Sequence, residues 1–337
     1  MASRSLNDAS FYRTIWRWHF YAGLFVMPFI LILSITGAIY LFKPQVERWE
    51  ERAFQGLPTT NGVSPNVQLD AALRAFPGAR FDSYRLPERA GDAAMIHLAL
   101  ADGRAMRDVF VSPQGPVLGS LDPEARLMEL DSEIHGSLLA GRIGSWLVEL
   151  AACWAIVMVL TGLYLWWPAK ATGGRRGMAG VVWPRFNAGK RILWRDLHAV
   201  TGFWVGGLAL VLLVTGLPWA GVWGDAFTMA RTELGLIEGK QDWTIGGKAP
   251  GGGEHAEHDH DAMIRMQPAN VSMASLANIV AKAEGERLAF PVLVKPPGAP
   301  NRFGPPGAMA WTVKSEAQNR TLRATITYDM ATGGELT

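Results

Sequence analysis

Two stretches of the chain place a histidine, a glycine and a Thr-Gly pair at the same offsets. The first runs from His19 to Gly37 and the second from His198 to Gly216, with a glycine four residues after each histidine and threonine seventeen residues after it. Almost every residue between the histidine and the Thr-Gly pair is apolar. Each stretch therefore predicts a membrane-spanning helix with an imidazole at one end. Two matched imidazoles at equal depth can ligate one metal ion or one haem between them.

Three segments are long and apolar enough to cross a bilayer. Residues 20–42 carry no charge, residues 197–224 contain His198 as their only ionisable group, and residues 143–169 are interrupted only by Glu149. A spanning helix needs about 20 apolar residues. The chain as a whole is 49% hydrophobic and 18% charged, which indicates a membrane part combined with water-soluble parts. No small-residue cleavage pattern follows the first segment, so we interpret it as a retained anchor.

Basic residues predict the orientation. The connection 169–197 has one acid, Asp196, against seven basic residues, and the N-terminal tail is also basic. Short positively charged segments remain in the cytoplasm. The N-terminus is therefore expected inside, with 44–134 and 225–337 outside. The basic connection lacks aromatic or groove-reading motifs, so it does not indicate nucleic-acid binding.

The two outer segments have similar patterns. A short helix is predicted at 66–76 and another at about 272–284, and each is followed by three strand-like runs. These runs are 79–86, 93–100 and 105–112 in the first segment and 288–295, 308–314 and 321–329 in the second. Each segment therefore predicts a small α+β unit. A linker at 246–261, rich in Gly, His and acidic residues, precedes the second helix.

These predictions together give a membrane α-helical protein with three spans and two small outer α+β units. The expected order is a cytoplasmic tail (1–18), transmembrane helix 1 (19–43), an outer domain (44–134), transmembrane helix 2 with its lead-in (135–168), a basic loop (169–197), transmembrane helix 3 (198–224) and a second outer unit (225–337).

Several motifs resemble the PepSY-associated transmembrane proteins. They are the Trp-His-x3-Gly-Leu start of the first span (18–24), Ile-His-Gly at 134–136, Leu-Thr-Gly-Leu-Tyr-Leu-Trp-Trp-Pro at 160–168, and Asp-Leu-His-x3-Gly at 196–202. The combined pattern extends over nearly the whole chain. The resemblance implies a protein of the bacterial inner membrane whose outer segments are periplasmic PepSY-like units. It also implies a role in iron acquisition, where some members look like haem-b ferrisiderophore reductases.

One feature departs from that family pattern. Members usually continue into a fourth span that carries another histidine, whereas this sequence ends at Thr337. The fourth span is therefore expected to be missing, or one ligand to be absent.

The residues themselves suggest how haem b would bind. His19 and His198 both enter the membrane from the inner side and are the predicted axial ligands. Arg17 and Arg195 lie next to them, where they can pair with propionates. His135 precedes the second span at the outer face, where it can ligate a second haem together with the expected fourth-span histidine. The glycine after each inner histidine would leave room for a flat macrocycle.

Each of these features also has a plainer interpretation. A histidine at a helix end can be an interfacial polar residue, and Thr-Gly pairs are common in helix packing. Arg17 and Arg195 can be ordinary positive-inside residues. The repetition of His19 and His198 in one leaflet favours ligation, because ionisable groups in a membrane are costly.

Other candidates are weaker. Glu149 is either a proton acceptor or a hydrogen-bond partner of a neighbouring helix, and we favour the latter. His97 lies in an alternating strand pattern and is expected to be structural or on the surface. The tract 254–261 has metal-ligand types in His255, His258 and His260, but its Gly-rich setting is more typical of a solvated linker with weak metal affinity.

Absent motifs narrow the function. The sequence has no G-x-G-x-x-G or P-loop pattern, no C-x-x-C-H for covalent haem and no hydrolase elbow. Any haem is thus noncovalent, and electrons must come from a partner, either a cytoplasmic reductase or flavin or a membrane quinol.

The leading hypothesis is one or two haems b passing electrons to periplasmic ferric iron, held as a siderophore or another ferric chelate. The alternative is a membrane-anchored PepSY binding or inhibitory module without redox activity. Metal transport ranks last, because the spans contain few polar residues.

Overall fold

The computed structural model describes residues 6–101, 105–166, 182–187, 189–236, 275–299, 310–329 and 334–336. These residues belong to two compact units. The helical unit contains residues up to 38 and residues 133–236, and the sheet unit contains residues 39–132 and 275–336. The tract 254–261 and residues 169–181 of the basic loop lie outside the described residues, so the candidates His255, His258 and His260 are not placed.

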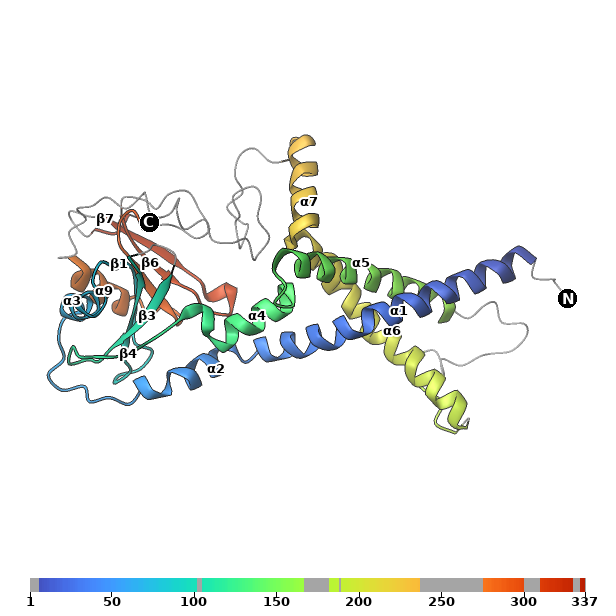
Figure 1. Ribbon diagram of the computed structural model, residues 1–337, viewed down its shortest axis with the longest axis horizontal. Coiled ribbons are helices and arrows are strands. Elements are labelled where there is room, and N and C mark those ends of the chain that lie inside the picture. The colour runs from blue at the N-terminus through green and yellow to red at the C-terminus, as the bar shows by residue number, and fades with distance from the viewer. Residues whose placement is uncertain are drawn as a thin grey trace. The chain divides into compact units, whose positions relative to one another are not determined.

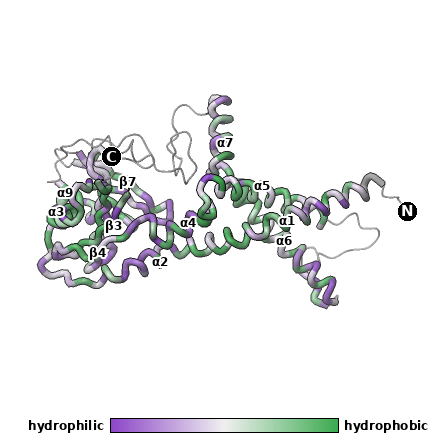
Figure 2. Tube along the Cα trace, viewed as in Figure 1, coloured by the Kyte–Doolittle hydropathy of each residue, from purple (hydrophilic) through white to green (hydrophobic). Residues whose placement is uncertain are grey.

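Three long helices build the helical unit: α1 (Leu6–Tyr40), α5 (Gly141–Trp166) and α6 (Lys190–Gly216) (Figure 1). All three are long and apolar enough to cross a membrane, and Figure 2 shows the apolar stretches along them. Helices α1 and α6 begin before the predicted starts at residues 19 and 198, because the helical pattern continues into the polar residues that precede each histidine.

The third helix ends earlier than the predicted residue 224. Helix α6 stops at Gly216, followed by a short 3-10 turn, η3 (Leu217–Trp219), and by α7 (Gly221–Glu233). Pro218 lies in this turn, and proline has no N–H with which to continue the helical hydrogen bonding. The carboxylate of Glu149 on α5 accepts hydrogen bonds from the backbone N–H groups of Val222, at 3.1 Å, and Trp223, at 3.3 Å.

Glu149 therefore binds the first turn of α7, where N–H groups lack helical partners and the helix dipole favours a negative charge. The preferred interpretation of Glu149, a hydrogen bond to a neighbouring helix, is confirmed.

The sheet unit contains seven antiparallel strands in the order β4-β3-β2-β1-β5-β6-β7. The strands are β1 (Arg80–Arg85), β2 (Ala94–Ala99), β3 (Met106–Val111), β4 (Val117–Leu121), β5 (Val292–Lys295), β6 (Ala310–Ser315) and β7 (Thr325–Asp329). The helices and 3-10 turns around them are α2 (Lys43–Glu50), η1 (Glu51–Phe54), α3 (Pro65–Ala75), η2 (Pro123–Ala125), α4 (Leu127–Ser137), α9 (Leu276–Gly285) and η5 (Arg320–Leu322).

The prediction of two separate outer α+β units is wrong in one respect. The strands of both segments form a single sheet. Strand β1 of the first segment pairs with β5 of the second, with Tyr84 opposite Val294 and Arg85 opposite Leu293. Each segment has the predicted helix and the three predicted strands, and the first has β4 in addition. The strands join because pairing β1 with β5 removes two exposed sheet edges.

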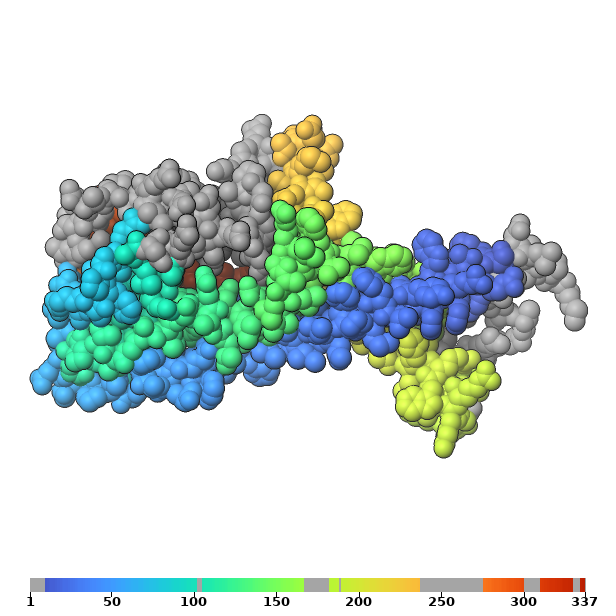
Figure 3. All heavy atoms as spheres, viewed as in Figure 1, coloured from blue at the N-terminus to red at the C-terminus, as the bar shows by residue number. Residues whose placement is uncertain are grey.

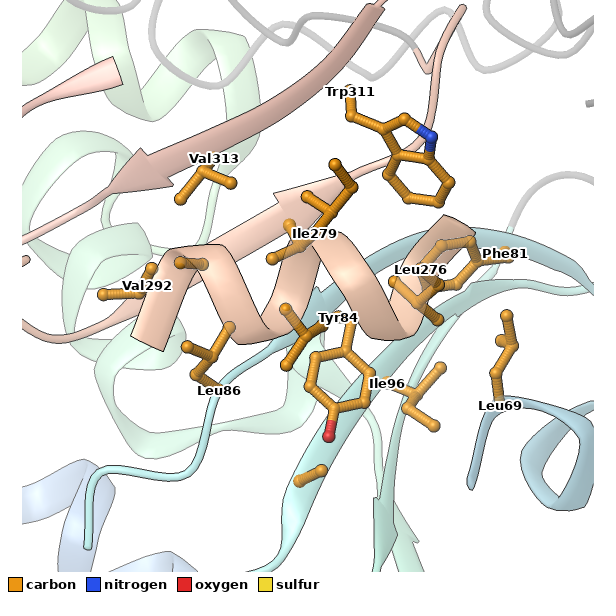
Figure 4. Packing of buried hydrophobic residues seen from close by; sticks show 14 of the residues in the cluster. Leu69, Phe81, Tyr84, Leu86, Ile96, Leu276, Ile279, Val292, Trp311 and Val313 are labelled. Carbon is orange, nitrogen blue, oxygen red and sulfur yellow. The ribbon is translucent and has the colours of Figure 1, made fainter. Parts of the chain in front are cut away.

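One hydrophobic core belongs to both segments. Helix α3 packs on the strands of the first segment, and α9 packs on β5 and β6. Figure 4 shows Leu276 and Ile279 of α9 lying between Tyr84 and Ile96 on one side and Trp311 on the other. All these side chains are buried and belong to one contiguous cluster. The apolar face of each helix therefore covers the same side of one sheet.

A buried ion cluster lies beside the first strand of the sheet unit. Arg85 donates two hydrogen bonds to the carboxylate of Glu51, at 2.6 and 3.0 Å, and Arg126 donates a third at 2.8 Å. Burial alone would raise the pKa of Glu51, but these two guanidinium groups outweigh it and lower that pKa. His97 lies 2.6 Å from the buried Asp108 on the neighbouring strand, so its expected structural role is confirmed.

The lowered pKa of Glu51 predicts acid sensitivity of the sheet unit. A carboxyl group with a folded pKa below its unfolded pKa, about 4.3 for Glu, stabilises the fold above that pH. This contribution is lost as the pH falls through the lower, folded pKa. Glu51→Gln should reduce the free energy of unfolding by about 3 kcal/mol at pH 6, since it leaves the buried Arg85 without its carboxylate partner. The difference from wild type should shrink towards pH 3.

Hydrogen exchange of β1 peptides between pH 6 and pH 3, corrected for the intrinsic exchange rates, measures this difference. Glu88→Gln is the matched control, because Glu88 pairs with Arg48 at the surface, where ion pairs contribute about 0–1 kcal/mol. A constant difference between wild type and Glu51→Gln over this pH range would contradict the prediction.

Candidate haem site

The helical unit brings the two inner histidines together. His19 of α1 and His198 of α6 have ring centroids 6.3 Å apart, with 71° between the ring planes. Both helices pack against α5. Gly23 of α1 lies beside Met158, and Gly206 of α6 lies beside Val159. Helix α5 therefore positions both histidines, although it contributes neither.

The ring separation fits a shared metal ion. Two imidazoles that bind one metal from opposite sides hold their centroids about 6 Å apart, because each metal–nitrogen bond spans about 2 Å and each ring centre lies about 1 Å behind its nitrogen. The residues present thus fit a group with two axial imidazoles. Across the described residues, no cluster of three or more His, Cys, Asp or Glu side chains suits a metal ion held by protein ligands alone.

Hydrogen bonding determines which nitrogen of His19 is protonated. Its Nδ1 lies 3.0 Å from the carbonyl oxygen of Met158 and 3.3 Å from Oγ1 of Thr161. A carbonyl oxygen can only accept, so Nδ1 carries the proton and Nε2 has the free lone pair. A carbonyl or carboxylate partner at the second nitrogen is the usual arrangement for a metal-binding histidine.

Gly162 gives the ring of His19 its space. A Cβ atom at Gly162 would lie 2.8 Å from Cε1 and 3.3 Å from Nδ1 of His19. Any side chain there would displace the imidazole. Thr161-Gly162 is one of six Thr-Gly pairs in the sequence, so the pair alone does not indicate that Gly162 meets His19.

The glycines that follow the histidines have different surroundings. No atom lies within 4 Å of a Cβ built on Gly202, whereas a Cβ on Gly23 would lie 3.7 Å from the sulfur of Met158. The predicted space for a macrocycle is therefore present on α6, while Gly23 serves the contact between α1 and α5.

His198 is exposed on α6, and Figure 3 shows the first turns of this helix, in yellow-green, projecting away from α1. Two residues earlier, the buried Asp196 accepts hydrogen bonds from the side chains of Arg185, at 2.7 and 3.0 Å, and Arg195, at 2.9 and 3.3 Å. This pairing ties the segment 182–187 to the helix that carries His198. The sequence motif contained Asp196, but its arginine partner could not be predicted.

The two arginine candidates differ. Arg195 is mostly exposed although it pairs with Asp196, so part of its hydrogen-bonding capacity is already used. Arg17 is exposed on α1 two residues before His19. Arg17 and Arg195 thus lie within one helical turn of His19 and His198 along the sequence.

His135 lies far from this pair along the helices, at the opposite end of α1. Its Nδ1 is 2.8 Å from Oγ1 of Thr36, and its Cε1 would be 3.6 Å from a Cβ on Gly37. Since His19 contacts the end of α5 and His135 precedes its start, α1 and α5 run antiparallel. The histidines thus mark two sites, one at each end of the helices.

The comparison with protein families agrees with this architecture. The family described as the PepSY-associated TM region matches residues 16–331, which include most of α1, all of α5 and α6, and the strands of both segments. No curated protein matches the chain. The family match covers nearly the full sequence and includes the motifs at each histidine, and the chain therefore belongs to the PepSY-associated transmembrane family.

Proposed function

We propose that this membrane protein binds haem b between His19 and His198 and carries electrons to ferric iron on the other side of the bilayer. The observation that carries the proposal is the His19–His198 pair, whose centroids are 6.3 Å apart, with Nδ1 of His19 held by the carbonyl of Met158. Imidazole pairs in a membrane are costly unless they are used.

The residues of the chain have defined roles in this proposal. His19 and His198 would supply nitrogen ligands to the haem iron, and Arg17 and Arg195 are candidates for pairing with its propionates. A haem held by two imidazoles exchanges one electron at a time, with a potential that depends on its ligands and their surroundings. Helix α5 packs against both histidine-bearing helices and thereby sets their relative positions. The apolar side chains of all three helices exclude water.

His135 supplies one imidazole to a second haem near the other end of the helices. We assign this end to the periplasmic side of an inner membrane, with the N-terminus in the cytoplasm, because the basic residues lie at the opposite end. Electrons would enter from a cytoplasmic reductase, a flavin or a quinol, and would leave to a ferric siderophore or another ferric chelate. Hard oxygen ligands hold Fe³⁺ better than Fe²⁺, so one-electron reduction releases the iron.

A reduced-minus-oxidised visible spectrum of the detergent-purified protein tests the haem. We expect a low-spin b-type spectrum in wild type and its loss from the inner site in His19→Gly and His198→Gly. Added imidazole should restore it in both glycine variants, because free imidazole can enter the space left by the side chain. A colourless wild type from haem-sufficient cells would reject the proposal and favour the anchored binding module.

The electron acceptor needs a separate experiment. Reduced protein is mixed anaerobically with a ferric hydroxamate or a ferric catecholate, and haem oxidation is followed together with trapping of Fe²⁺. Equal rates of both processes with at least one chelate support ferric reductase activity. A haem protein that remains reduced with both chelates would keep the cofactor assignment and reject the acceptor.

A further inference from the structure

Two Thr-Gly pairs of the helical unit each hold a histidine ring from another helix. Thr161 and Gly162 of α5 contact His19. Thr36 and Gly37 of α1 contact His135 in the same manner, with the hydroxyl at Nδ1 and the glycine beside Cε1. Each pair lies near the C-terminal end of its own helix, and because α1 and α5 run antiparallel the two contacts are at opposite ends of the packed helices. The recurrence is therefore not a result of one local contact.

The threonine hydroxyl acts as an acceptor in both places. Oγ1 of Thr36 lies 3.0 Å from the carbonyl oxygen of Ile32 and 3.3 Å from that of Leu33. This back-bonding, which is common for threonine within helices, uses the single hydroxyl proton. The oxygen therefore accepts from Nδ1–H of His135. Thr161 is back-bonded in the same way, to Val157 at 2.7 Å and Met158 at 3.0 Å.

A third Thr-Gly pair shows that the hydroxyl orientation does not depend on a histidine. Thr215 of α6 donates to the carbonyls of Val211, at 2.7 Å, and Leu212, at 3.3 Å. No atom lies within 4 Å of a Cβ on Gly216, and Thr215 is exposed. The helix alone thus orients the threonine hydroxyl so that its oxygen can accept a hydrogen bond from an imidazole that packs beside the glycine.

We infer that Thr36 and Thr161 are positioning residues that hold His135 and His19 as Nδ1–H tautomers, with Gly37 and Gly162 giving the rings room to lie against the helix. Nε2 of each ring is then the nitrogen available to a metal. The tautomer follows from the hydrogen bonds alone, and only the identity of the metal as haem iron depends on the proposed function.

The three threonines predict three different effects of removing the hydroxyl. Thr36 provides the hydrogen bond at Nδ1 of His135, so Thr36→Val should change the tautomer ratio of His135 by about 2- to 10-fold towards Nε2–H. Thr161→Val should have a smaller effect on His19, because the closer carbonyl of Met158 remains. Thr215→Val is the matched control and should change neither ring.

Histidine ¹⁵N NMR of the whole chain, purified without haem, measures the tautomers directly. Thr36→Ser retains the hydroxyl and should preserve the wild-type signal of His135, which distinguishes hydrogen bonding from a packing defect. An unchanged His135 tautomer in Thr36→Val would overturn the inference, and so would a wild-type His135 that is already Nε2–H.

Haem-loaded protein provides a second readout. Loss of the hydrogen bond makes the imidazole a weaker donor, which favours the ferrous state and raises the midpoint potential, by about 59 mV for each tenfold loss of ferric over ferrous affinity. A colourless wild type with the Nδ1–H tautomer would reject haem binding and leave the positioning role standing. A haem protein whose tautomers are the same in Thr36→Val would reject the positioning role alone.

Discussion

Gly162→Leu is expected to abolish haem binding at the inner site while the protein still inserts and folds. A Cβ at this position would already lie 2.8 Å from Cε1 of His19, closer than van der Waals contact allows. The imidazole is rigid, so it must leave the carbonyl of Met158 and lose its orientation. Losing only the hydrogen bond to a metal ligand typically weakens metal binding about 10- to 100-fold. Displacing the ligand itself should therefore weaken haem retention by more. The haem-to-protein ratio after purification measures the effect.

Two further variants make this result specific. Gly162→Ala should give an intermediate loss, because it adds only the Cβ atom. Gly207→Leu on α6 is the matched control, since no atom lies within 4 Å of a Cβ there and leucine favours the helix. Full haem retention in Gly162→Leu would show that the pairing of His19 with α5 is not needed for binding. Equal loss in Gly207→Leu would indicate a general defect of the helices.

Trp311→Ala is expected to destabilise strands of the first segment as well as its own. Trp311 of β6 is fully buried in the cluster that also contains Ile96 of β2. Truncating a buried tryptophan costs about 3–5 kcal/mol, and a shared core distributes this loss over the whole sheet. Hydrogen exchange should therefore accelerate in β2 peptides by a factor similar to that in β6 peptides.

The outcome distinguishes one cooperative sheet from two adjoining units. Faster exchange confined to β5, β6 and β7 would contradict the shared core and would indicate two independent units. Leu322→Ala is the control, since Leu322 is 55% exposed in the same segment and its truncation should leave the exchange of β2 unchanged.

Local sequence signals predicted most elements of this fold. The apolar runs gave the three long helices, and alternation with turn residues gave six of the seven strands. The pairing of β1 with β5 could not be predicted, because the two strands are separated by two long helices and each segment has a complete pattern of its own. The end of α6 was placed too late, since the apolar composition continues through Pro218 into α7.

The candidate site was predictable only in part. Repetition identified His19 and His198 as a pair, and the structure brings their rings together. The carbonyl of Met158 and the space at Gly162 carry no sequence signal of their own, because both depend on which face α5 turns towards α1. The pairing of Arg185 with Asp196 could not be predicted either, because the loop contains seven basic residues.

The junction between β1 and β5 affects how the protein is made. Strand β1 ends at Arg85 and β5 begins at Val292, so about 200 residues are synthesised between them, which takes roughly 10–40 s at 5–20 residues per second. During this time the first four strands have an unpaired edge that is open to wrong partners. In the proposed topology, the two strands can meet only when α5 and α6 cross the bilayer in opposite directions. Completion of the sheet would then depend on correct insertion of both helices.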